Sequence, residues 1–312
     1  MVSPQHQPPA APSLRIFLAA LAIALCSCSP ARPAAPDTFD GKRAFAALER
    51  QCRFGPRCPG CPGHEKALAD LIAALRRHAD EVTTQQFDHT HSADRRVLHL
   101  TNVIAIFRAD APPARETVLF AAHWDTRPTA DKEKDPDRRS QPIAGANDGA
   151  SGVAVLLELA RVLAGRRLDQ NVILVLFDGE DYGPTAADMF LGSRYFAEHL
   201  PNPRPDWGAV VDMIGDRDLS IPVERYSWQR ARQVVERIWG AAERIGVAAF
   251  KRKVGRPVLD DHLPLLKAGI PCVDIIDTDY PPWHTLDDTP DKCSAASLQA
   301  VGDVLLAVLE EP

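Results

Sequence analysis

The chain of 312 residues has no block of basic residues, no long hydrophobic run and no internal repeat. A net charge of −6 without a cluster of Lys and Arg argues against a protein that binds nucleic acid, because such proteins carry a concentrated positive patch. The N-terminal hydrophobic run, Ile16–Leu25, has ten residues, about half of the roughly 20 that a membrane-spanning helix needs. The lack of a repeat or of a second compositional regime predicts a single folded domain.

The N-terminal segment is expected to be a targeting signal rather than part of the fold. The short apolar run Ile16–Leu25 is typical of a secretory signal peptide, which we predict over residues 1–28. The Leu-Cys-Ser-Cys sequence at its end resembles a bacterial lipoprotein cleavage box, with Cys28 as the lipidated residue and Cys26 as the alternative. Ordinary signal cleavage nearby is the other interpretation. Residues 29–40, rich in Pro and Ala, would form an extended tether. An exported protein, periplasmic or held at the membrane only by a lipid anchor, is therefore expected.

The cysteines beyond this segment form two groups. Cys52, Cys58 and Cys61 lie close together in the sequence, whereas Cys272 and Cys293 lie far downstream. An exported compartment permits disulfides, so we expect a local disulfide among the first three. The Cys-Pro-Gly-Cys spacing is that of a redox motif, but its strand-to-helix context is missing, and a zinc ribbon would need a second pair. Cys272 lies in an apolar segment and is expected to be a buried thiol.

Hydrophobic periodicity predicts strands alternating with helices in one domain over residues 41–312. Strands are expected at 82–87, 97–107, 117–122, 171–177, 207–214 and 271–276. Helices are expected at 42–52, 64–78, 153–163, 192–200, 227–245, 260–266 and 294–309. This alternation predicts an α/β fold, a three-layer sandwich in which helices flank a mixed, mostly parallel central sheet.

Polar motifs follow the apolar runs, and the segment that organises them is Val175–Pro184. Its apolar residues break into Asp178, Gly179, Glu180 and Asp181 where a strand is expected to end. Neighbouring carboxylates on an extended segment point in different directions, so one can bind a metal while the other transfers a proton. We expect Asp178 to support the loop. For this tetrapeptide alone, a solvated acidic turn is the alternative.

Two further acids have contrasting simple explanations. Asp148 precedes a helix, and capping that helix is the simple alternative to a functional role. Asp212 is a lone acid in an apolar strand, and burying it without a partner is costly, which favours a function. Strand ends of a parallel sheet meet at one edge, so we expect a cluster of His123, Asp125, Asp148, Glu180, Asp181, Asp212, Asp260 and His284. Histidine and carboxylates on convergent loops favour a zinc site that leaves a coordination position open.

The order of these motifs resembles the zinc-dependent aminopeptidase-like superfamily and, more specifically, bacterial members of its glutaminyl cyclase branch. Over about residues 45–310 the matching segments are His123-Trp-Asp125, Gly145-Ala-Asn-Asp148, Asp178-Gly-Glu180-Asp181, Val211-Asp212 and Trp283-His284-Thr-Leu-Asp-Asp, with Phe54–Gly60 similar to the cyclases' N-terminal loop. The resemblance implies conversion of N-terminal glutamine of peptides or proteins to pyroglutamate with release of ammonia, by a monomer. A zinc aminopeptidase is the first alternative. A noncatalytic, zinc-stabilised peptide-binding lipoprotein is the second.

The resemblance implies one zinc ion per chain, held by Asp148, Asp181 and His284. Related two-zinc aminopeptidases would use His123 and Asp212 as additional ligands around a second ion. The cyclases are similar at those positions, so the ligand inventory leaves one and two zinc ions open.

The resemblance also assigns the catalytic residues. Glu180 is implied to be the general acid/base, with Asp212 and Asp260 sharing protons with the leaving amide. Trp283 matches the wall of the cyclase pocket, and Asp260-Asp261-His262 matches a cyclase loop that aminopeptidases usually lack. These two features favour the cyclase over the aminopeptidase.

Two departures from the mammalian-type cyclases stand out. Those enzymes carry Glu-Glu where this chain has Glu180-Asp181, and the shorter Asp requires a backbone nearer to the metal by about 1 Å. They carry histidine where this chain has Asp274, which leaves that part of the pocket undetermined.

Overall fold

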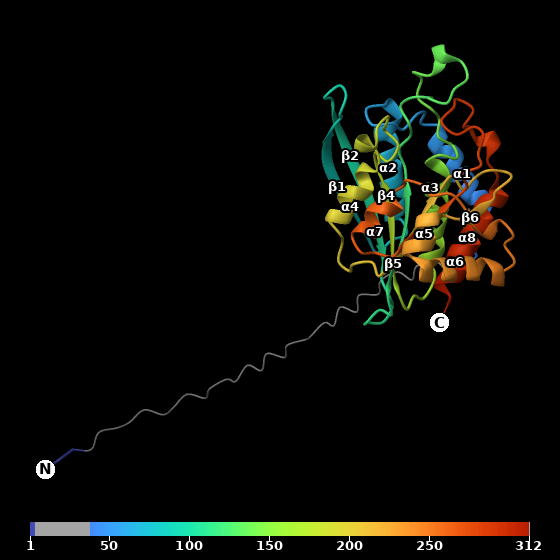
Figure 1. Ribbon diagram of the computed structural model, residues 1–312. Helices are drawn as coiled ribbons and strands as arrows, with labels where there is room; N and C mark the ends of the chain where they lie inside the picture. Colours follow the sequence, from blue (N-terminus) through green and yellow to red (C-terminus); the bar gives the residue numbers. More distant parts are fainter. Residues whose placement is uncertain (4–37, 312) are drawn as a thin grey trace. The chain divides into compact units, whose positions relative to one another are not determined.

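A six-stranded sheet lies at the centre of the fold (Figure 1). The computed structural model describes residues 1–3 and 38–311. The expected signal peptide and tether lie almost wholly outside these ranges, as does Cys28, so they remain predictions. Within the described ranges, no helix combines the length and apolar character needed to cross a bilayer.

The sheet is mixed and mostly parallel, which confirms the prediction. Its order is β1 (Glu81–Thr90), β2 (Val97–Phe107), β4 (Asn171–Phe177), β3 (Thr117–His123), β5 (Trp207–Asp212) and β8 (Cys272–Ile276). Strands β4, β3, β5 and β8 pair in parallel, whereas β1 pairs antiparallel with β2 and β2 with β4. The inner strands are continuous apolar runs because helices bury both of their faces. Cys272 is buried in β8, as expected.

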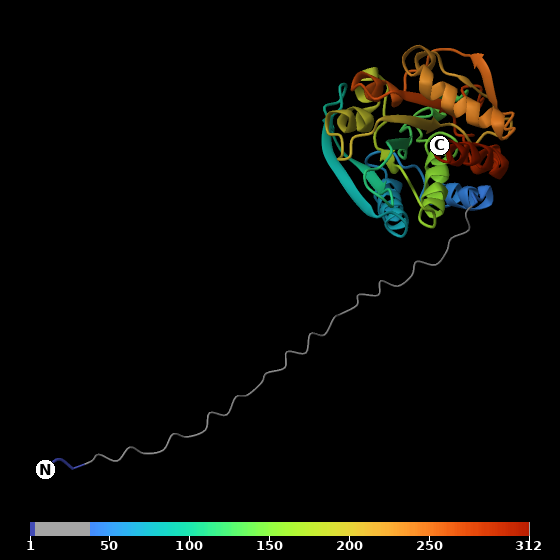
Figure 2. The same cartoon turned by 90° about the horizontal axis from the view of Figure 1, so that it is seen from below.

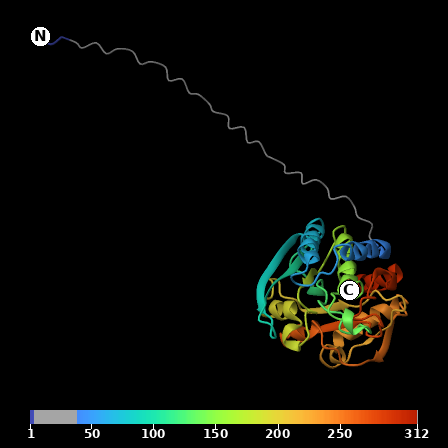
Figure 3. The ribbon, with the colours of Figure 1, turned by 90° about the horizontal axis from the view of Figure 1, so that it is seen from above.

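Helices cover both faces of the sheet and form the outer layers. They are α1 (Gly41–Cys52), α2 (Pro62–Arg76), α3 (Ala150–Leu163), α4 (Leu191–Glu198), α5 (Arg225–Arg230), α6 (Arg232–Arg244), α7 (His262–Lys267) and α8 (Ala295–Leu309). Figure 2 and Figure 3 show α1, α2 and α3, in blue to green, on one side of the sheet, and α4 and α7, in yellow and orange, on the other. The predicted three-layer sandwich is confirmed.

One expected helix is divided. The amphipathic segment 227–245 forms α5 and α6, which are separated at Ala231 by a non-helical backbone with φ −135° and ψ 37°. Helix α5 packs against β8, whereas α6 packs mainly against α8 and β7. Helix α6 buries an apolar face, whereas α5 buries Ser227 and packs the half-buried Trp228 against the core, so tertiary packing divides the segment at Ala231.

A small parallel sheet of β6 (Ile221–Val223) and β7 (Phe250–Val254) was not predicted. Strand β6 has only three residues, and the centre of β7 is Lys-Arg-Lys, exposed to solvent. Neither strand carries the apolar alternation by which a strand is recognised in a sequence.

A close contact at Gly152 places the start of α3 against the sheet. A Cβ atom at this glycine would lie 2.2 Å from the Val211 carbonyl oxygen and 2.9 Å from the Ala122 side chain. Only glycine permits this approach between the helix and strands β3 and β5. The N-terminal end of α3, which Asp148 precedes, is thereby brought beside the end of β5, where Asp212 lies.

Candidate active site

Strand ends and the loops that follow them bring the expected polar residues together. His123 ends β3, Glu180 and Asp181 follow β4, and Asp212 ends β5. A pocket of about 410 Å³ opens at this edge. Its wall includes Asp148, Glu180, Asp181, Asp212, Asp260, Trp283 and His284, and His123 lies buried beside it.

Three of these residues form a group that fits a zinc ion. The His284 Nε2 atom lies 3.5 Å from Asp148 Oδ2 and 3.3 Å from Asp181 Oδ2. Both carboxylate oxygens are buried and have no hydrogen-bond partner among the described residues. A buried carboxylate oxygen without a partner is costly, and two of them facing one imidazole nitrogen match the donors that zinc takes. Asp181 reaches this group despite its short side chain.

A second group shares Asp148 with the first. The His123 Nε2 atom lies 3.2 Å from Asp148 Oδ1 and 3.1 Å from Asp212 Oδ1. Here the imidazole is already hydrogen-bonded to Asp212. The first group therefore has the unsatisfied oxygens that call for a cation, whereas the second is partly satisfied by its own side chains.

Glu180 belongs to neither group and lies in the pocket beside them. Its Oε2 atom is 3.8 Å from His123 Nδ1. Burial raises the pKa of Glu180 well above its usual value, and the Asp181 and Asp260 charges add to this effect while His123 opposes it. A carboxyl with a raised pKa holds a proton more readily than an ordinary glutamate, which suits it to accept and return a proton during a reaction.

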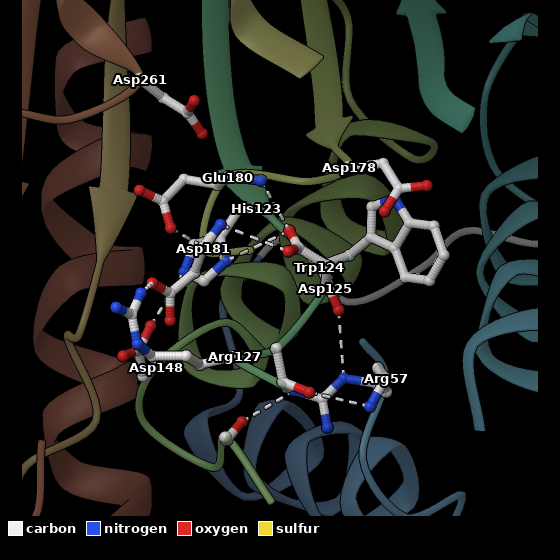
Figure 4. Close-up of polar contacts among 12 residues, drawn as sticks. Arg57, His123, Trp124, Asp125, Arg127, Asp148, Asp178, Glu180, Asp181 and Asp261 are labelled. Carbon is white, nitrogen blue, oxygen red and sulfur yellow. Dashed lines mark hydrogen bonds and ion pairs between the residues drawn. The ribbon is translucent and has the colours of Figure 1, made fainter. Parts of the chain in front are cut away.

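Asp125 holds the loop that carries Glu180 and Asp181, as Figure 4 shows. Its Oδ1 atom accepts a hydrogen bond from the Glu180 N–H at 3.1 Å, and its Oδ2 atom accepts one from the Asp181 N–H at 3.3 Å. Oδ1 also lies 3.6 Å from His123 Nδ1. The sequence placed Asp125 in the cluster, and the structure gives it contacts that orient the other members.

Asp178 turns away from the pocket in Figure 4. Its carboxylate accepts from the Thr101 N–H at 2.7 Å and lies 2.9 Å from His64 Nε2. The His64 ring in turn stacks on Trp124, with ring centroids 4.4 Å apart. These contacts hold the start of the acidic loop in place, so the role of Asp178 is to support that loop.

Arg57 ties the N-terminal loop to the site loops. Its fully buried guanidinium donates to the carbonyl oxygens of Trp124 (3.1 Å), Ala144 (2.9 Å) and Gly145 (2.7 Å). The next residue, Cys58, forms a disulfide with Cys61, which is the local disulfide expected from the sequence. The only sequence signal for Arg57 was its position in a loop similar to that of the cyclases.

Arg127 and Asp131 lie outside the group of Asp148, Asp181 and His284, here called the zinc-fitting group, and contact two of its members. The Arg127 Nη1 atom donates to Asp181 Oδ1 at 2.5 Å, and its Nε atom donates to Asp131 Oδ1 at 2.6 Å. The same Asp131 oxygen lies 3.1 Å from His284 Nδ1. Such outer partners orient ligand side chains. Sequence reasoning missed both residues, because they lie in a charged loop, residues 126–144, that carries no motif.

The Asp260-Asp261-His262 loop forms a buried acidic cluster behind the pocket. Asp260 lines the pocket, and burial together with the Asp212 charge raises its pKa to about 7. His262 Nδ1 lies 3.7 Å from Asp274 Oδ2, and both side chains are fully buried. Burial and the Asp260 charge raise the pKa of Asp274 well above its usual value. Asp274 thus adds a further buried carboxyl to Asp260 and Asp261 behind the pocket.

Glu224 anchors this cluster and provides a test of stability against pH. Its carboxylate accepts from the N–H groups of Tyr226 (2.8 Å), Ser227 (2.6 Å) and Val258 (3.0 Å). Burial alone would raise its pKa, but His262 and these donors lower the pKa from 4.5 to about 2. Because the folded pKa is depressed, the stabilisation is present above about pH 4.5 and is lost as the pH falls toward 2.

We therefore expect Glu224→Gln to lower the free energy of unfolding by about 2 kcal/mol at pH 7. The difference from the wild type should shrink as the pH falls below about 4.5. Urea unfolding at pH 7, 5 and 3.5 measures both effects. Glu65→Gln, at an exposed position on α2, is the matched control and should change little. A Glu224→Gln difference that stays constant with pH would contradict the charge-dependent explanation.

Three pocket residues have a left-handed backbone without being glycine. They are Phe190, Met213 and His284, with φ of 58°, 47° and 56°. Arg95 is the remaining such residue in the described ranges. Non-glycine residues with this conformation are uncommon and concentrate at functional sites.

Comparisons with known proteins identify the family of this chain. Peptidase family M28 matches residues 102–309. Aminopeptidase YwaD of Bacillus subtilis is 26% identical over 290 residues, covering 87% of this chain and 57% of its own length. A glutaminyl-peptide cyclotransferase of Drosophila melanogaster is 27% identical, covering 75% of this chain and 70% of its own length. The chain thus spans little more than half of the first relative and about two thirds of the second.

Solved structures are similar over most of this chain. Glutaminyl cyclase of Bacteroides thetaiotaomicron, bound to N-acetylhistamine, is 32% identical with a TM-score of 0.83, covering 89% of this chain and 100% of its own. The Tannerella forsythia glutaminyl cyclase is 35% identical with a TM-score of 0.83, covering 88% and 100%. A Zn-dependent exopeptidase of Parabacteroides distasonis is 31% identical with a TM-score of 0.82, covering 88% and 99%. The chain therefore belongs to peptidase family M28, and its structural neighbours include bacterial glutaminyl cyclases of the zinc aminopeptidase-like superfamily.

Proposed function

We propose that this protein is a glutaminyl-peptide cyclotransferase, which converts N-terminal glutamine of a peptide to pyroglutamate and releases ammonia. The observation that supports this most is the make-up of the pocket. Trp283 and Asp260 face the same space as Glu180 and the zinc-fitting group. The similarity to bacterial glutaminyl cyclases supports the same reaction.

Asp148, Asp181 and His284 would hold one zinc ion. When bound, that ion supplies a Lewis acid for the carbonyl oxygen of the substrate's γ-carboxamide. One carboxylate oxygen each of Asp148 and Asp181 lacks a hydrogen-bond partner, whereas His123 and Asp212 are hydrogen-bonded to each other. This difference supports one zinc ion rather than two.

Glu180 moves the proton in this reaction. The substrate's α-amine has a pKa near 8 and is partly protonated at neutral pH. Glu180 takes a proton from the amine as its nitrogen forms a bond to the γ-carbon, and then gives a proton to the departing nitrogen. The C–N bond of the amide breaks, ammonia leaves, and a five-membered lactam remains. Water is not consumed, which separates this reaction from peptide hydrolysis.

The pocket walls position the reacting groups. Asp212 and Asp260 lie where they can hold the leaving amide by hydrogen bonds, and the raised pKa of Asp260, about 7, lets its carboxyl donate as well as accept. The Trp283 ring lies 3.9 Å from the His284 ring, at a tilt of 31°. This indole forms an apolar wall, which favours a fixed orientation of the amine toward the amide.

We expect the purified protein to release ammonia from Gln-initiated peptides and no free amino acid from Leu-initiated ones. Ammonia and amino acids are measured separately, together with the metal content of the protein. The group of His123, Asp148 and Asp212 makes a two-zinc aminopeptidase the second candidate. Release of leucine without ammonia would establish that candidate instead. If neither product formed, the noncatalytic peptide-binding interpretation would stand.

A further inference from the structure

A second hollow continues from the active-site pocket across the surface. It has a volume of about 880 Å³ and is lined by residues of α4, α5 and α7. Helices α4 and α7 pack against each other, and both are labelled in Figure 1. Ala186, Phe190 and Leu259 line both the pocket and this hollow, so the two form one continuous groove.

The rim of the hollow is positively charged. Arg194, Arg230 and Lys267 line it, with Glu198 as its one carboxylate. The side chains of Arg230 and Lys267 make no hydrogen bond or ion pair with another residue of the described ranges. The guanidinium of Arg194 donates to the Ala186 carbonyl oxygen at 2.6 Å, a bond that leaves its charge without a carboxylate.

The floor of the hollow is largely apolar. Leu263, Pro264 and Ala268 lie there, and the Leu259 side chain at its junction with the pocket is 61% exposed. An apolar floor between cationic rims suits an extended chain whose own side chains carry negative charge. The molecule as a whole is acidic, with a net charge of −6, so the charge along this hollow is opposite in sign to the net charge of the chain.

We propose that this groove binds the substrate peptide downstream of its N-terminal glutamine and favours acidic residues there. The inference rests on the proposed cyclotransferase activity and names the class of substrate. The glutamine side chain occupies the pocket, the backbone passes Leu259 and Phe190, and the following residues lie between α4 and α7. Carboxylates at these positions face Arg230 and Lys267, whereas lysines would be repelled.

Three hexapeptides test the proposal: Gln-Ala-Asp-Asp-Asp-Ala, Gln-Ala-Ser-Ser-Ser-Ala and Gln-Ala-Lys-Lys-Lys-Ala, each amidated at its C-terminus. We expect kcat/KM for ammonia release to be about 10-fold higher for the acidic peptide than for the basic one at low salt. The ratio should fall to roughly 2-fold in 0.5 M NaCl, because exposed charges are screened. Equal kcat/KM for all three peptides at low salt would overturn the inference while leaving the cyclotransferase intact. Absence of ammonia from every peptide would instead overturn the proposed function.

Charge reversal assigns the preference to this groove. The double variant Arg230→Glu/Lys267→Glu should lower the ratio of acidic to basic peptide to 1 or below. Lys66→Glu is the matched control, because Lys66 is exposed on α2 and lines neither hollow. The control should keep the wild-type ratio. A double variant that also keeps it would show that the preference arises elsewhere and would refute this groove as its source.

Discussion

Glu180→Gln should lower kcat for Gln-initiated peptides on the order of 10³-fold while zinc remains bound. The amide of glutamine cannot accept the proton of the substrate amine, so ring closure loses its base. The backbone N–H of residue 180 would still donate to Asp125, and the side chain has the same shape, so the loop should stay in place. Metal content is expected to be unchanged, because Glu180 belongs to none of the groups of side chains that could hold a metal ion.

Steady-state ammonia release and elemental analysis of the same sample measure both parts of this prediction. Thermal unfolding of the variant excludes a general loss of structure. Activity near that of the wild type would remove Glu180 from the role of general acid/base. Loss of zinc together with activity would show instead that Glu180 contributes to metal binding.

His284→Ala should weaken zinc binding strongly and lower turnover with it. The imidazole faces the unsatisfied oxygens of Asp148 and Asp181, and without it two carboxylates alone would have to hold the ion. Changes to outer partners alone cost about 10- to 100-fold in metal affinity, so we expect loss of a ligand to cost at least about 100-fold. Turnover should fall with zinc occupancy, since the γ-carboxamide then lacks its Lewis acid.

His99→Ala provides the matched control, because His99 is an exposed imidazole on β2 that pairs with Asp88. It should retain zinc and activity. Titration of metal-free protein with zinc gives the affinity and the number of ions, which we expect to be one for the wild type. A His284→Ala variant that retains zinc at wild-type affinity would place the metal elsewhere.

Much of the fold could be predicted because its elements are long and strongly patterned. Strand β4 was expected at 171–177 and lies there, since an apolar run bounded by polar residues leaves little choice. The break at Ala231 and strand β7 could not be predicted. The first depends on which neighbours α5 and α6 pack against, and the second pairs through its backbone while its polar side chains face solvent.

The same division applies to the site. Asp181 follows the apolar run of β4, so the rule that parallel strand ends meet at one edge places it at the site. Asp148, before α3, and His284, in the loop after β8, were assigned to the same group by the resemblance of their motifs to a known family. Arg127 and Asp131 follow no such rule, because their contacts cross between loops that have no periodic signature. The shortened Asp181 also acquires a partner in Arg127 that the sequence did not indicate.

The left-handed conformations of Phe190, Met213 and His284 have a consequence for evolution and engineering. Each such residue costs about 1–3 kcal/mol relative to a relaxed backbone, so the pocket wall is held in shape by its neighbours rather than by local preference. Substitutions that relax these positions would be selected in a search for heat resistance. The same substitutions would change the shape of the pocket wall and lower activity. Thermostability and activity are therefore expected to trade against each other here.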